Sequence, residues 1–399
     1  MPLENEEKSQ KRSKDMLRIG RNLMFLFIIN LVTALCMNVI NPLFPLFVQG
    51  LGASVFEISL VLFAQGLLST VLMIPSGFLS DRYSRKGMIA LSTLMVGIPP
   101  FFYAFVTSWK QTIPWAMMFM GAFAVFLPPR MTLIADSTEP KTRATVYGIM
   151  NLTWPIGGLI GPIIGGFLAD RYGWNYSFYF VTSLSLLCLI PTFLLREPCR
   201  RSRKEREKKP HRTFFNQEIL FVLAVFSLFQ IFGNIGRGIL NPVIPLYLTD
   251  KFQVSKTQVG LFFSAGFGMA ILLAQIPSGI LADRYGRKKF MAYCLSMIPV
   301  LSMLWPWLND YLLLTILFML ITGLWSTTWP ASTAYLMDLT PTLKRGTTIA
   351  FRQAAVRLGF TIGPLVGGYL WEAYGPTASF YASAISFAMS FFLVLLLRE

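Results

Sequence analysis

Long apolar stretches alternate with short polar segments along almost the whole chain. Twelve of these stretches hold about 20 residues, the length that an α-helix needs to cross a bilayer. We predict the spans to be residues 22–48, 57–79, 88–108, 112–134, 144–168, 175–195, 217–248, 257–281, 290–308, 311–336, 346–371 and 376–397. Strands are not expected, because backbone polar groups in hydrocarbon need internal partners and no barrel-type alternation is visible. The pattern therefore predicts an all-α membrane protein with 12 transmembrane helices.

The second half of the sequence repeats the first. PSGFLSDRYSRKG at 75–87 recurs as PSGILADRYGRKK at 277–289, and the offset between their aspartates is 283 − 81 = 202. A duplicated apolar chain predicts two pseudo-symmetric six-helix bundles that face each other across a cleft, where a transporter holds its cargo. The predicted parts are a cytoplasmic tail at 1–21, an N-terminal bundle at 22–196, a basic linker at 197–216 and a C-terminal bundle at 217–399.

Composition and charge support a multi-pass membrane protein. The chain is 54% hydrophobic and 14% charged, more apolar than a soluble protein of this length can bury. The net charge of +16 is concentrated before the first span, in the linker and in alternate short loops. The positive-inside rule then predicts that both termini and the linker are cytoplasmic. The expected location is the cell (plasma or inner) membrane. Membrane lipid is an expected partner of the linker, and nucleic acid is not, because the basic residues form no single patch.

Residue types that carry enzymatic chemistry are scarce. The four cysteines are scattered and the only histidine, His211, lies in the linker, so neither a metal site nor another cofactor is expected. The chain has no P-loop and no H-E-x-x-H or Ser-His arrangement. An enzyme is therefore not expected, and a receptor without transport activity is the remaining alternative outside transport.

Two loop motifs carry a resemblance to a known family. GFLSDRYSRK at 77–86 and GILADRYGRK at 279–288 resemble the G-x-L-x-D-R-x-G-R-K signature of the major facilitator superfamily, with Ser84 in place of the usual glycine. The resemblance implies that Asp81 contacts the N-terminus of the eleventh span and Asp283 that of the fifth, where the helix dipole favours an anion. Such contacts would latch the cytoplasmic side. The alternative is that the motifs are only a topology signal of positive charge.

Other residues of these loops would assist the latch. Gly77 and Gly279 would allow neighbouring helices to approach closely. The arginines of the two motifs would tie loop carboxylates; the arginines are Arg82, Arg85, Arg284 and Arg287, and the carboxylates are Asp136 and Asp338.

A glycine pattern marks the fifth span and recurs in the eleventh. GGLIGPIIGG at 157–166 resembles the motif of the antiporter branches of the superfamily. The glycines fall four residues apart and so share one helix face; they are Gly157, Gly161 and Gly165, repeated as Gly359, Gly363 and Gly367. We expect these smooth faces to pack closely against a neighbouring helix, and Pro162 and Pro364 to bend the two helices. Ordinary helix packing is the alternative to a conformational role.

The first span carries a third resemblance. MNVINPLFP at 37–45 resembles the proline-containing signature of the 12-helix drug:proton antiporters. Pro42 and Pro45 predict a kink, and Asn38 and Asn41 either satisfy the freed carbonyls or face the cargo. The superfamily's arginine in the fourth span is replaced by Met117 here, so Arg-based proton coupling at that place is not implied.

Arginines inside the membrane are functional candidates, because a buried charge costs about 2.5–3.5 kcal/mol on insertion scales. Arg237 and Arg357 fall near mid-span and are predicted to face the cavity, Arg352 either faces the cavity or reaches the cytoplasmic edge, and Arg130 is expected to snorkel to that edge. No acidic residue sits clearly at mid-span. The cavity is therefore predicted to be positive and to accept an organic anion, or an amphipath with an anionic head.

Further cavity residues are predicted by their place near the expected cleft: Asn151, Trp154, Trp325, Trp329 and Gln353. A mostly apolar pocket with a few polar anchors suits an amphipathic cargo, although the aromatic side chains could equally face lipid or pack in the bundle. The sequence thus predicts a monomeric secondary transporter that works by alternating access, exports amphipathic or anionic small molecules, and has protons as its candidate coupling ion. The alternative is a proton-coupled importer or facilitator of an anionic metabolite.

Overall fold

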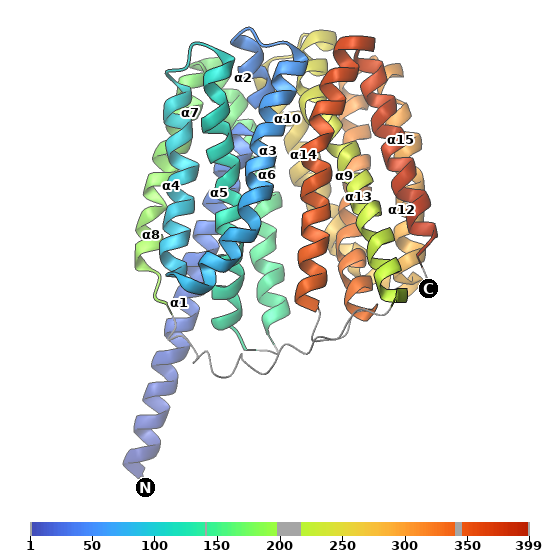
Figure 1. Cartoon of the computed structure of the whole chain (residues 1–399). Coiled ribbons are helices and arrows are strands. Elements are labelled where there is room, and N and C mark those ends of the chain that lie inside the picture. Colours follow the sequence, from blue (N-terminus) through green and yellow to red (C-terminus); the bar gives the residue numbers. More distant parts are fainter. Residues whose placement is uncertain (1, 140–141, 198–216, 340–344, 398–399) are drawn as a thin grey trace.

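The computed structural model describes residues 2–139, 142–197, 217–339 and 345–397. Every regular element in this part of the chain is helical (Figure 1). The first half contains α1 (Pro2–Ile40), α2 (Phe44–Gly50), α3 (Val55–Arg82), α4 (Arg85–Tyr103), α5 (Trp109–Asp136), α6 (Arg143–Arg171), α7 (Trp174–Leu187) and α8 (Leu189–Leu194). The second half contains α9 (Gln217–Phe252), α10 (Lys256–Ser264), the π-helix η2 (Ala265–Ala270), α11 (Ile271–Tyr285), α12 (Arg287–Met303), the 3-10 helix η3 (Trp305–Trp307), α13 (Tyr311–Leu339), α14 (Arg345–Tyr374) and α15 (Pro376–Leu395).

Ten helical segments of the described chain are long and apolar enough to cross a membrane. They coincide with ten of the predicted spans, so the all-helical membrane class is confirmed. The segments without this property are α4 and α14. Charge and proline explain the difference, because α4 begins with Arg85 and Lys86 and contains two prolines, and α14 carries two arginines near its middle.

Proline breaks the first span as predicted. The chain leaves α1 at Ile40 and re-enters a helix at Phe44, after a turn that contains Pro42. A proline lacks the N–H that would continue the ladder, and its ring clashes with the preceding turn. The corresponding prolines of the second half, Pro242 and Pro245, lie inside α9, which stays continuous. The two repeats therefore differ at this place.

Helices pack both within each half of the chain and between the halves. In the first half α1 packs on α6, and α5 packs on α3 and α4; in the second half α9 packs on α14 and α15, and α12 packs on α13 and α15. The halves meet along two further helix pairs, α3 with α14 and α6 with α10. These pairs define the space between the halves.

The glycine faces of α6 and α14 are in tight contact with their neighbours, as predicted. A Cβ atom on Gly165 would lie 2.2 Å from the carbonyl oxygen of Val39 in α1, and one on Gly359 would lie 2.3 Å from that of Ile231 in α9. Gly157 and Gly161 also approach α1, and Gly363 and Gly367 approach α9. These contacts join helices of one half. Pro162 and Pro364 lie inside continuous helices, and the bend expected there stays a prediction.

Aromatic triads at matching positions make the internal repeat visible in the structure. One triad is Phe47, Tyr103 and Phe178, and the other is Tyr247, Trp305 and Phe380. The ring centroids of Phe47 and Phe178 lie 4.7 Å apart, and those of Tyr247 and Phe380 lie 4.8 Å apart. Such pairs add stability beyond the area that they bury. Both triads are buried and join the first, third and sixth predicted spans of their half.

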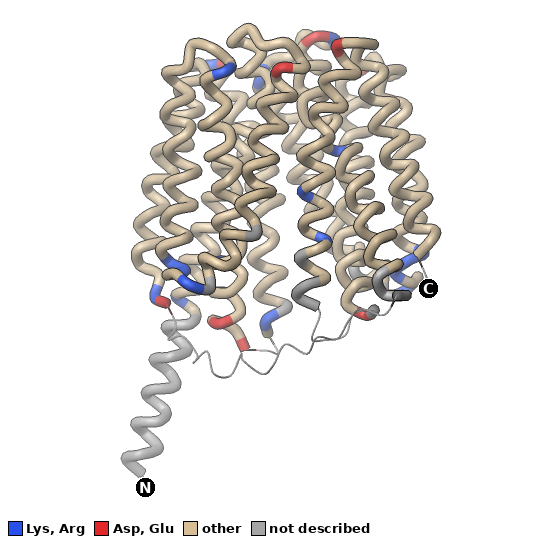
Figure 2. Tube along the Cα trace, viewed as in Figure 1, with Lys and Arg blue, Asp and Glu red and all other residues tan. Residues whose placement is uncertain are grey.

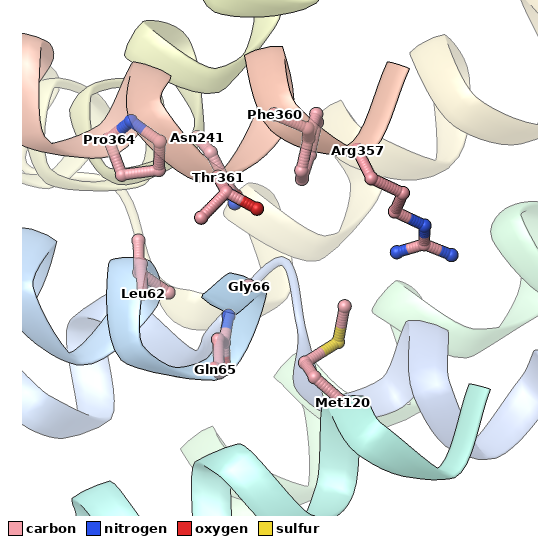
Figure 3. A pocket seen from close by; sticks show the side chains of 9 residues that line it. All are labelled: Leu62, Gln65, Gly66, Met120, Asn241, Arg357, Phe360, Thr361 and Pro364. Carbon is pink, nitrogen blue, oxygen red and sulfur yellow. The ribbon is translucent and has the colours of Figure 1, made fainter. Parts of the chain in front are cut away.

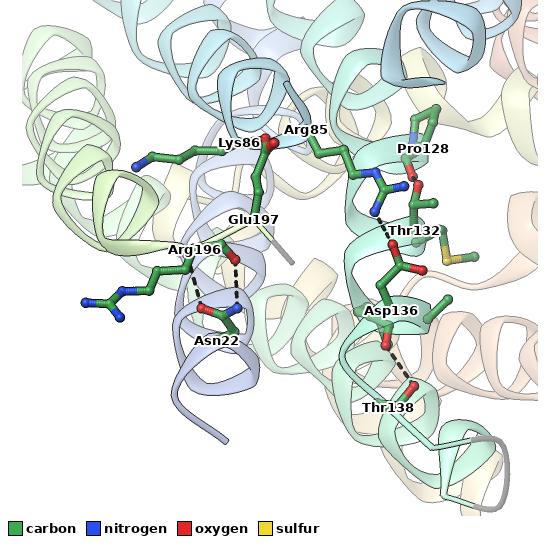
Figure 4. A network of polar contacts seen from close by, with 12 residues as sticks. Asn22, Arg85, Lys86, Pro128, Thr132, Asp136, Thr138, Arg196 and Glu197 are labelled. Carbon is green, nitrogen blue, oxygen red and sulfur yellow. Dashed lines mark hydrogen bonds and ion pairs between the residues drawn. The ribbon is translucent and has the colours of Figure 1, made fainter. Parts of the chain in front are cut away.

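The two ends of the helices differ in charge (Figure 2). We call the end with the starts of α4 and α12 the basic end, and the opposite end, with the starts of α3 and α10, the distal end. A polar network holds the first half together at the basic end (Figure 4). Asn22 of α1 exchanges hydrogen bonds with the backbone of Arg196, and Glu197 accepts from the backbone N–H of Lys86 at 2.7 Å. The start of α4 is thereby tied to the segment after α8.

Candidate functional site

Arg357 lines a small cavity between the two halves (Figure 3). The cavity has a volume of about 10 Å³, room for roughly one water molecule. Its other lining residues are Leu62, Gln65 and Gly66 of α3, Met120 of α5, Asn241 of α9, and Phe360, Thr361 and Pro364 of α14. None of them is acidic. Figure 3 shows the guanidinium of Arg357 extended into the space between α14 and the helices of the first half.

A ring from the first half covers this guanidinium. The Cζ atom of Arg357 lies 4.4 Å from the ring centroid of Phe123 in α5, within the range of a cation–π interaction. Phe123 in turn makes an edge contact with Trp154 of α6, with centroids 5.1 Å apart. Arg357 therefore lines the space between the halves, in agreement with the prediction that it faces the cavity. Its role in binding cargo stays a prediction.

Arg237 of α9 is surrounded by aromatic rings. Its Cζ atom lies 5.8 Å from the ring of Trp325, 5.9 Å from that of Trp329 and 5.9 Å from that of Phe360. It has no hydrogen-bond or ion-pair partner among the described residues. Rings attract the faces of a guanidinium and leave its N–H edge for an oxyanion. Trp325 is 2% exposed and Trp329 is 40% exposed, so of these two rings only Trp329 has a substantial accessible surface.

One side chain connects the two arginine sites. Phe360 lines the cavity together with Arg357 and also lies beside Arg237. Phe360 and Arg357 are three residues apart in α14, which places them on adjacent turns of one face. The two guanidiniums therefore share one aromatic neighbour, and together they form a positively charged region in the middle of the helices.

Arg130 does not snorkel, and that prediction is wrong. The residue is only 3% exposed, and its Nη2 atom donates to the side-chain oxygen of Asn151 at 3.0 Å and to the carbonyl of Met150 at 3.3 Å. Acceptors on α6 lie within hydrogen-bond distance of the guanidinium, and a buried guanidinium needs such acceptors. Asn151 is consequently engaged within the first half, although it was predicted to contact cargo.

Arg352 has a related position in the second half. Its Nη2 atom lies 3.5 Å from the hydroxyl of Ser332 in α13, and its Nε atom is buried without a partner. Ser332 is the repeat equivalent of Arg130, since 332 − 130 = 202. An arginine thus bridges α5 and α6 in one half, and α13 and α14 in the other. Gln353 beside it is half-buried and has no hydrogen-bond partner among the described side chains.

The asparagines of the first span divide between packing and the turn. Asn38 donates to the carbonyl of Ala34 in its own helix at 2.8 Å, which agrees with the packing alternative. Asn41 lies in the turn between α1 and α2. Its counterpart in the second repeat, Asn241, lines the cavity and was not selected from the sequence. The repeated Asn-Pro pair was the signal that could have identified it.

At the basic end the arginines divide into two groups. Arg85 forms an ion pair with Asp136, and Arg287 forms one with Asp338, as predicted (Figure 4 shows the first pair). Both pairs stay within one half. Arg82 and Arg284 are exposed and make no ion pair with a described carboxylate, and the guanidinium of Arg284 lies over Tyr285 instead.

The remaining loop residues give no evidence for the cytoplasmic latch. A Cβ atom on Gly77 would meet nothing within 4 Å, so the close helix approach predicted there is wrong for this structure. The halves are in contact elsewhere, along α3 with α14 and α6 with α10. The side chains of Asp81 and Asp283 and the surroundings of Gly279 lie outside the described residues. Their predicted role therefore stays a prediction.

Comparison with known proteins identifies the family. Residues 26–235 and 226–399 match the family model of the Major Facilitator Superfamily. The chain belongs to this superfamily. It is 28% identical to an MFS-type transporter of Methanocaldococcus jannaschii over 92% of this chain and 96% of the relative. It is also 26% identical to the multi-drug resistance efflux pump PmrA of Streptococcus pneumoniae, over 92% of this chain and 94% of PmrA.

Solved structures of the superfamily share the fold. A bacterial homologue of the human lysosomal transporter Spinster, solved in an inward-facing and unoccupied conformation, superposes with a TM-score of 0.74. The two chains are 17% identical, and the match covers 95% of each. Identity this low supports the same helical fold and says nothing about a shared cargo.

Proposed function

We propose that this protein is a secondary active transporter that exports amphipathic or anionic small molecules by alternating access. The observation that carries the cargo class is the pair of guanidiniums, Arg237 and Arg357, among aromatic rings and with no carboxylate in the cavity lining. A carrier of cations needs a buried acid to attract its cargo, whereas these groups attract an oxyanion. The efflux pump among the relatives supports export.

The membrane arrangement is part of the proposal. The two less apolar helices, α4 and α14, complete twelve spans in two pseudo-symmetric bundles of six. The repeated aromatic triads support the two-fold arrangement. The basic end faces the cytoplasm by the positive-inside rule. Both termini therefore lie on the cytoplasmic side of the cell membrane, and the distal end lies on the opposite side. The protein acts as a monomer, because each chain holds both halves of its own cleft.

Two observations bear on coupling to protons. Met117 stands where the superfamily carries an arginine in the fourth span, and neither Asp nor Glu lines the cavity. These two observations favour a second candidate function, a facilitator or importer of an anionic metabolite with the same binding site. The glycine pattern at 157–166, which resembles the motif of the antiporter branches, favours export.

A thermal-shift experiment tests the cargo class. Cholate and cortisol share a steroid body but differ in charge, and tetraphenylphosphonium supplies a cationic amphipath. Ligand binding raises apparent stability by mass action, so we expect cholate to raise the melting temperature of the purified protein more than the other two compounds do. Stabilisation by tetraphenylphosphonium alone would contradict an anionic cargo.

Flux measurements test the direction and the coupling. In proteoliposomes, counterflow of a stabilising anion with and without a pH gradient separates a proton-coupled exporter from a facilitator. An exporter moves the anion against its gradient when a pH gradient is imposed. A facilitator gives equal counterflow in both conditions.

A further inference from the structure

A carboxylate from the second half contacts the start of a helix in the first half. Glu372 lies in the last turn of α14, and its Oε2 atom accepts from the backbone N–H of Phe56 at 3.2 Å and from the hydroxyl of Ser54 at 3.2 Å. Ser54 is the N-cap residue of α3. Because α3 and α14 are antiparallel, the C-terminal end of one helix meets the N-terminal end of the other.

The second helix pair between the halves has the same contact. Asp170 lies at the end of α6, and its two oxygens accept from the backbone N–H groups of Lys256 at 3.1 Å and Thr257 at 2.6 Å. The hydroxyl of Thr257 donates to the same carboxylate at 2.6 Å. Asp170 and Glu372 are repeat equivalents, since 372 − 170 = 202. The distal end therefore carries two matching contacts, and each joins the two halves.

These contacts are favourable for a physical reason that both share. The first N–H groups of a helix have no partner within the helix, and the helix dipole makes that end positive. A carboxylate there satisfies the free donors through charge-assisted hydrogen bonds. Both helix starts also have capping boxes of their own, formed by Ser54 with Glu57 and by Ser255 with Gln258. Both helix starts are thus already capped within their own half, and the contacts from the other half are added to these caps.

The two helices of each pair lie very close together beside these contacts, so any separation of the halves would lengthen the hydrogen bonds. A Cβ atom on Gly368 would lie 2.1 Å from the hydroxyl oxygen of Ser59, and one on Gly166 would lie 2.3 Å from the carbonyl oxygen of Lys256. Each glycine lies about one helical turn before its carboxylate. Hydrogen bonds of this length break when the halves move apart by a few ångströms.

We infer that Asp170 and Glu372 form a two-part latch that closes the distal end. The latch is made in the present conformation and is released when the halves rock and the distal end opens. It stabilises the distal-closed state without touching the cargo. The inference therefore stands whether the cargo is an anion or not, and it requires only that the halves move relative to each other.

Cysteine accessibility tests the latch in the full-length protein. Ser59 is fully buried against Gly368, so Ser59→Cys, in a background with Cys36, Cys188, Cys199 and Cys294 replaced by serine, reports opening of the distal end. A membrane-impermeant maleimide is added from the distal side of reconstituted protein. We expect Asp170→Asn and Glu372→Gln each to raise the labelling rate about threefold to tenfold. The double variant should show roughly the product, because both contacts oppose one movement.

Glu57→Gln is the matched control. Glu57 is a carboxylate at the same helix start as Glu372, but it accepts from the backbone N–H of Ser54 in its own half at 2.9 Å. Gln258 fills the equivalent place in the second half, so glutamine preserves the cap. Labelling in this variant should match the parent. Unchanged labelling in both latch variants, or an equal increase in Glu57→Gln, would overturn the latch. If Asp170→Asn does not fold, Glu372→Gln alone carries the test, and unchanged labelling in that variant overturns the latch.

Discussion

The guanidinium of Arg357 lies 4.4 Å from the ring centroid of Phe123, so the two halves of the chain touch through a cation–π pair near the middle of α14 and α5. The ring covers one face of the guanidinium and leaves the N–H edge free, and an oxyanion binds to that edge. The ring and an anionic cargo can therefore contact the guanidinium of Arg357 at the same time. Phe123 would then hold the guanidinium in the orientation that receives the anion.

Replacement of Arg357 should reduce anion binding strongly. A hydrogen bond to a charged group contributes about 1.5–3 kcal/mol, so Arg357→Ala should weaken binding of cholate, or of another stabilising anion, about tenfold or more. Arg357→Lys keeps the charge but loses the planar fork, and it should show an intermediate affinity. Calorimetric titration of the purified variants measures both. Arg284→Ala, which removes an exposed arginine at the basic end, is the control for net charge.

Phe123 should contribute to anion affinity only by orienting the guanidinium of Arg357. Phe123→Leu keeps an apolar side chain but removes the ring that holds the guanidinium, an interaction of about 0.5–1 kcal/mol. We expect affinity for the anion to fall about twofold to fivefold, and Phe123→Tyr to retain the parent affinity. Tighter anion binding in Phe123→Leu would mean instead that the ring competes with the cargo for Arg357.

Trp329 should influence cargo selection beside Arg237. This ring lies 5.9 Å from the guanidinium and is the exposed member of the aromatic set. Trp329→Ala removes apolar area that an amphipathic body would cover, whereas Trp329→Phe keeps a ring. We expect the alanine variant to lose affinity for cholate about tenfold, and to retain more affinity for a small inorganic anion, which needs only the charge. Thermal shifts with both ligands provide the measurement, and equal losses for both ligands would argue against an aromatic contact with the cargo body.

The ion pair between Arg85 and Asp136 should contribute little to stability or transport. Its side chains are 15% and 43% exposed, and ion pairs of this kind contribute about 0–1 kcal/mol. Both residues belong to the first half and move together when the halves rock. A double-mutant cycle with Arg85→Ala and Asp136→Ala should therefore give a coupling energy below about 1 kcal/mol that falls as salt rises. A larger coupling that persists in high salt would show that the pair has a buried role.

Features that depend on pattern are predictable from the sequence. The helical spans follow from apolar length, the repeat follows from a constant offset, and Arg237 and Arg357 follow from the rarity of charge in apolar segments. The glycine faces of α6 and α14 were predictable because helical periodicity alone places their members on one side. The repeat compares positions 202 residues apart, whereas each of the other features depends on residues close together in the chain.

Partners across the chain could not be predicted in the same way. Phe123 and Arg357 are far apart in sequence, and nothing local to either identifies the other. The same holds for Glu372, whose partner is the N-terminus of α3. Arg130 was misplaced for a related reason, because its choice between the membrane edge and α6 depends on whether acceptors such as Asn151 lie within reach. Only the packed structure supplies that information.

Helix packing in α6 provides a prediction with an internal control. A Cβ atom on Gly165 would lie 2.2 Å from the carbonyl oxygen of Val39, closer than any real contact, so Gly165→Ala must push α1 and α6 apart. Overpacking of this kind costs about 1–3 kcal/mol. Gly148 lies in the same helix, and a Cβ atom there would meet nothing within 4 Å. Gly148→Ala should therefore stabilise the protein by about 0.5–1 kcal/mol, because alanine favours the helix.

Thermal unfolding of the purified variants should thus shift in opposite directions. Gly165→Ala is expected to melt lower than the parent, and Gly148→Ala at or above it. The equivalent contact in the second half gives a replicate, because a Cβ atom on Gly359 would lie 2.3 Å from the carbonyl oxygen of Ile231. Gly359→Ala should therefore destabilise as Gly165→Ala does. If Gly165→Ala and Gly148→Ala melted at the same temperature, the close approach of α1 and α6 would not be a stabilising contact, and the glycine face would need another explanation.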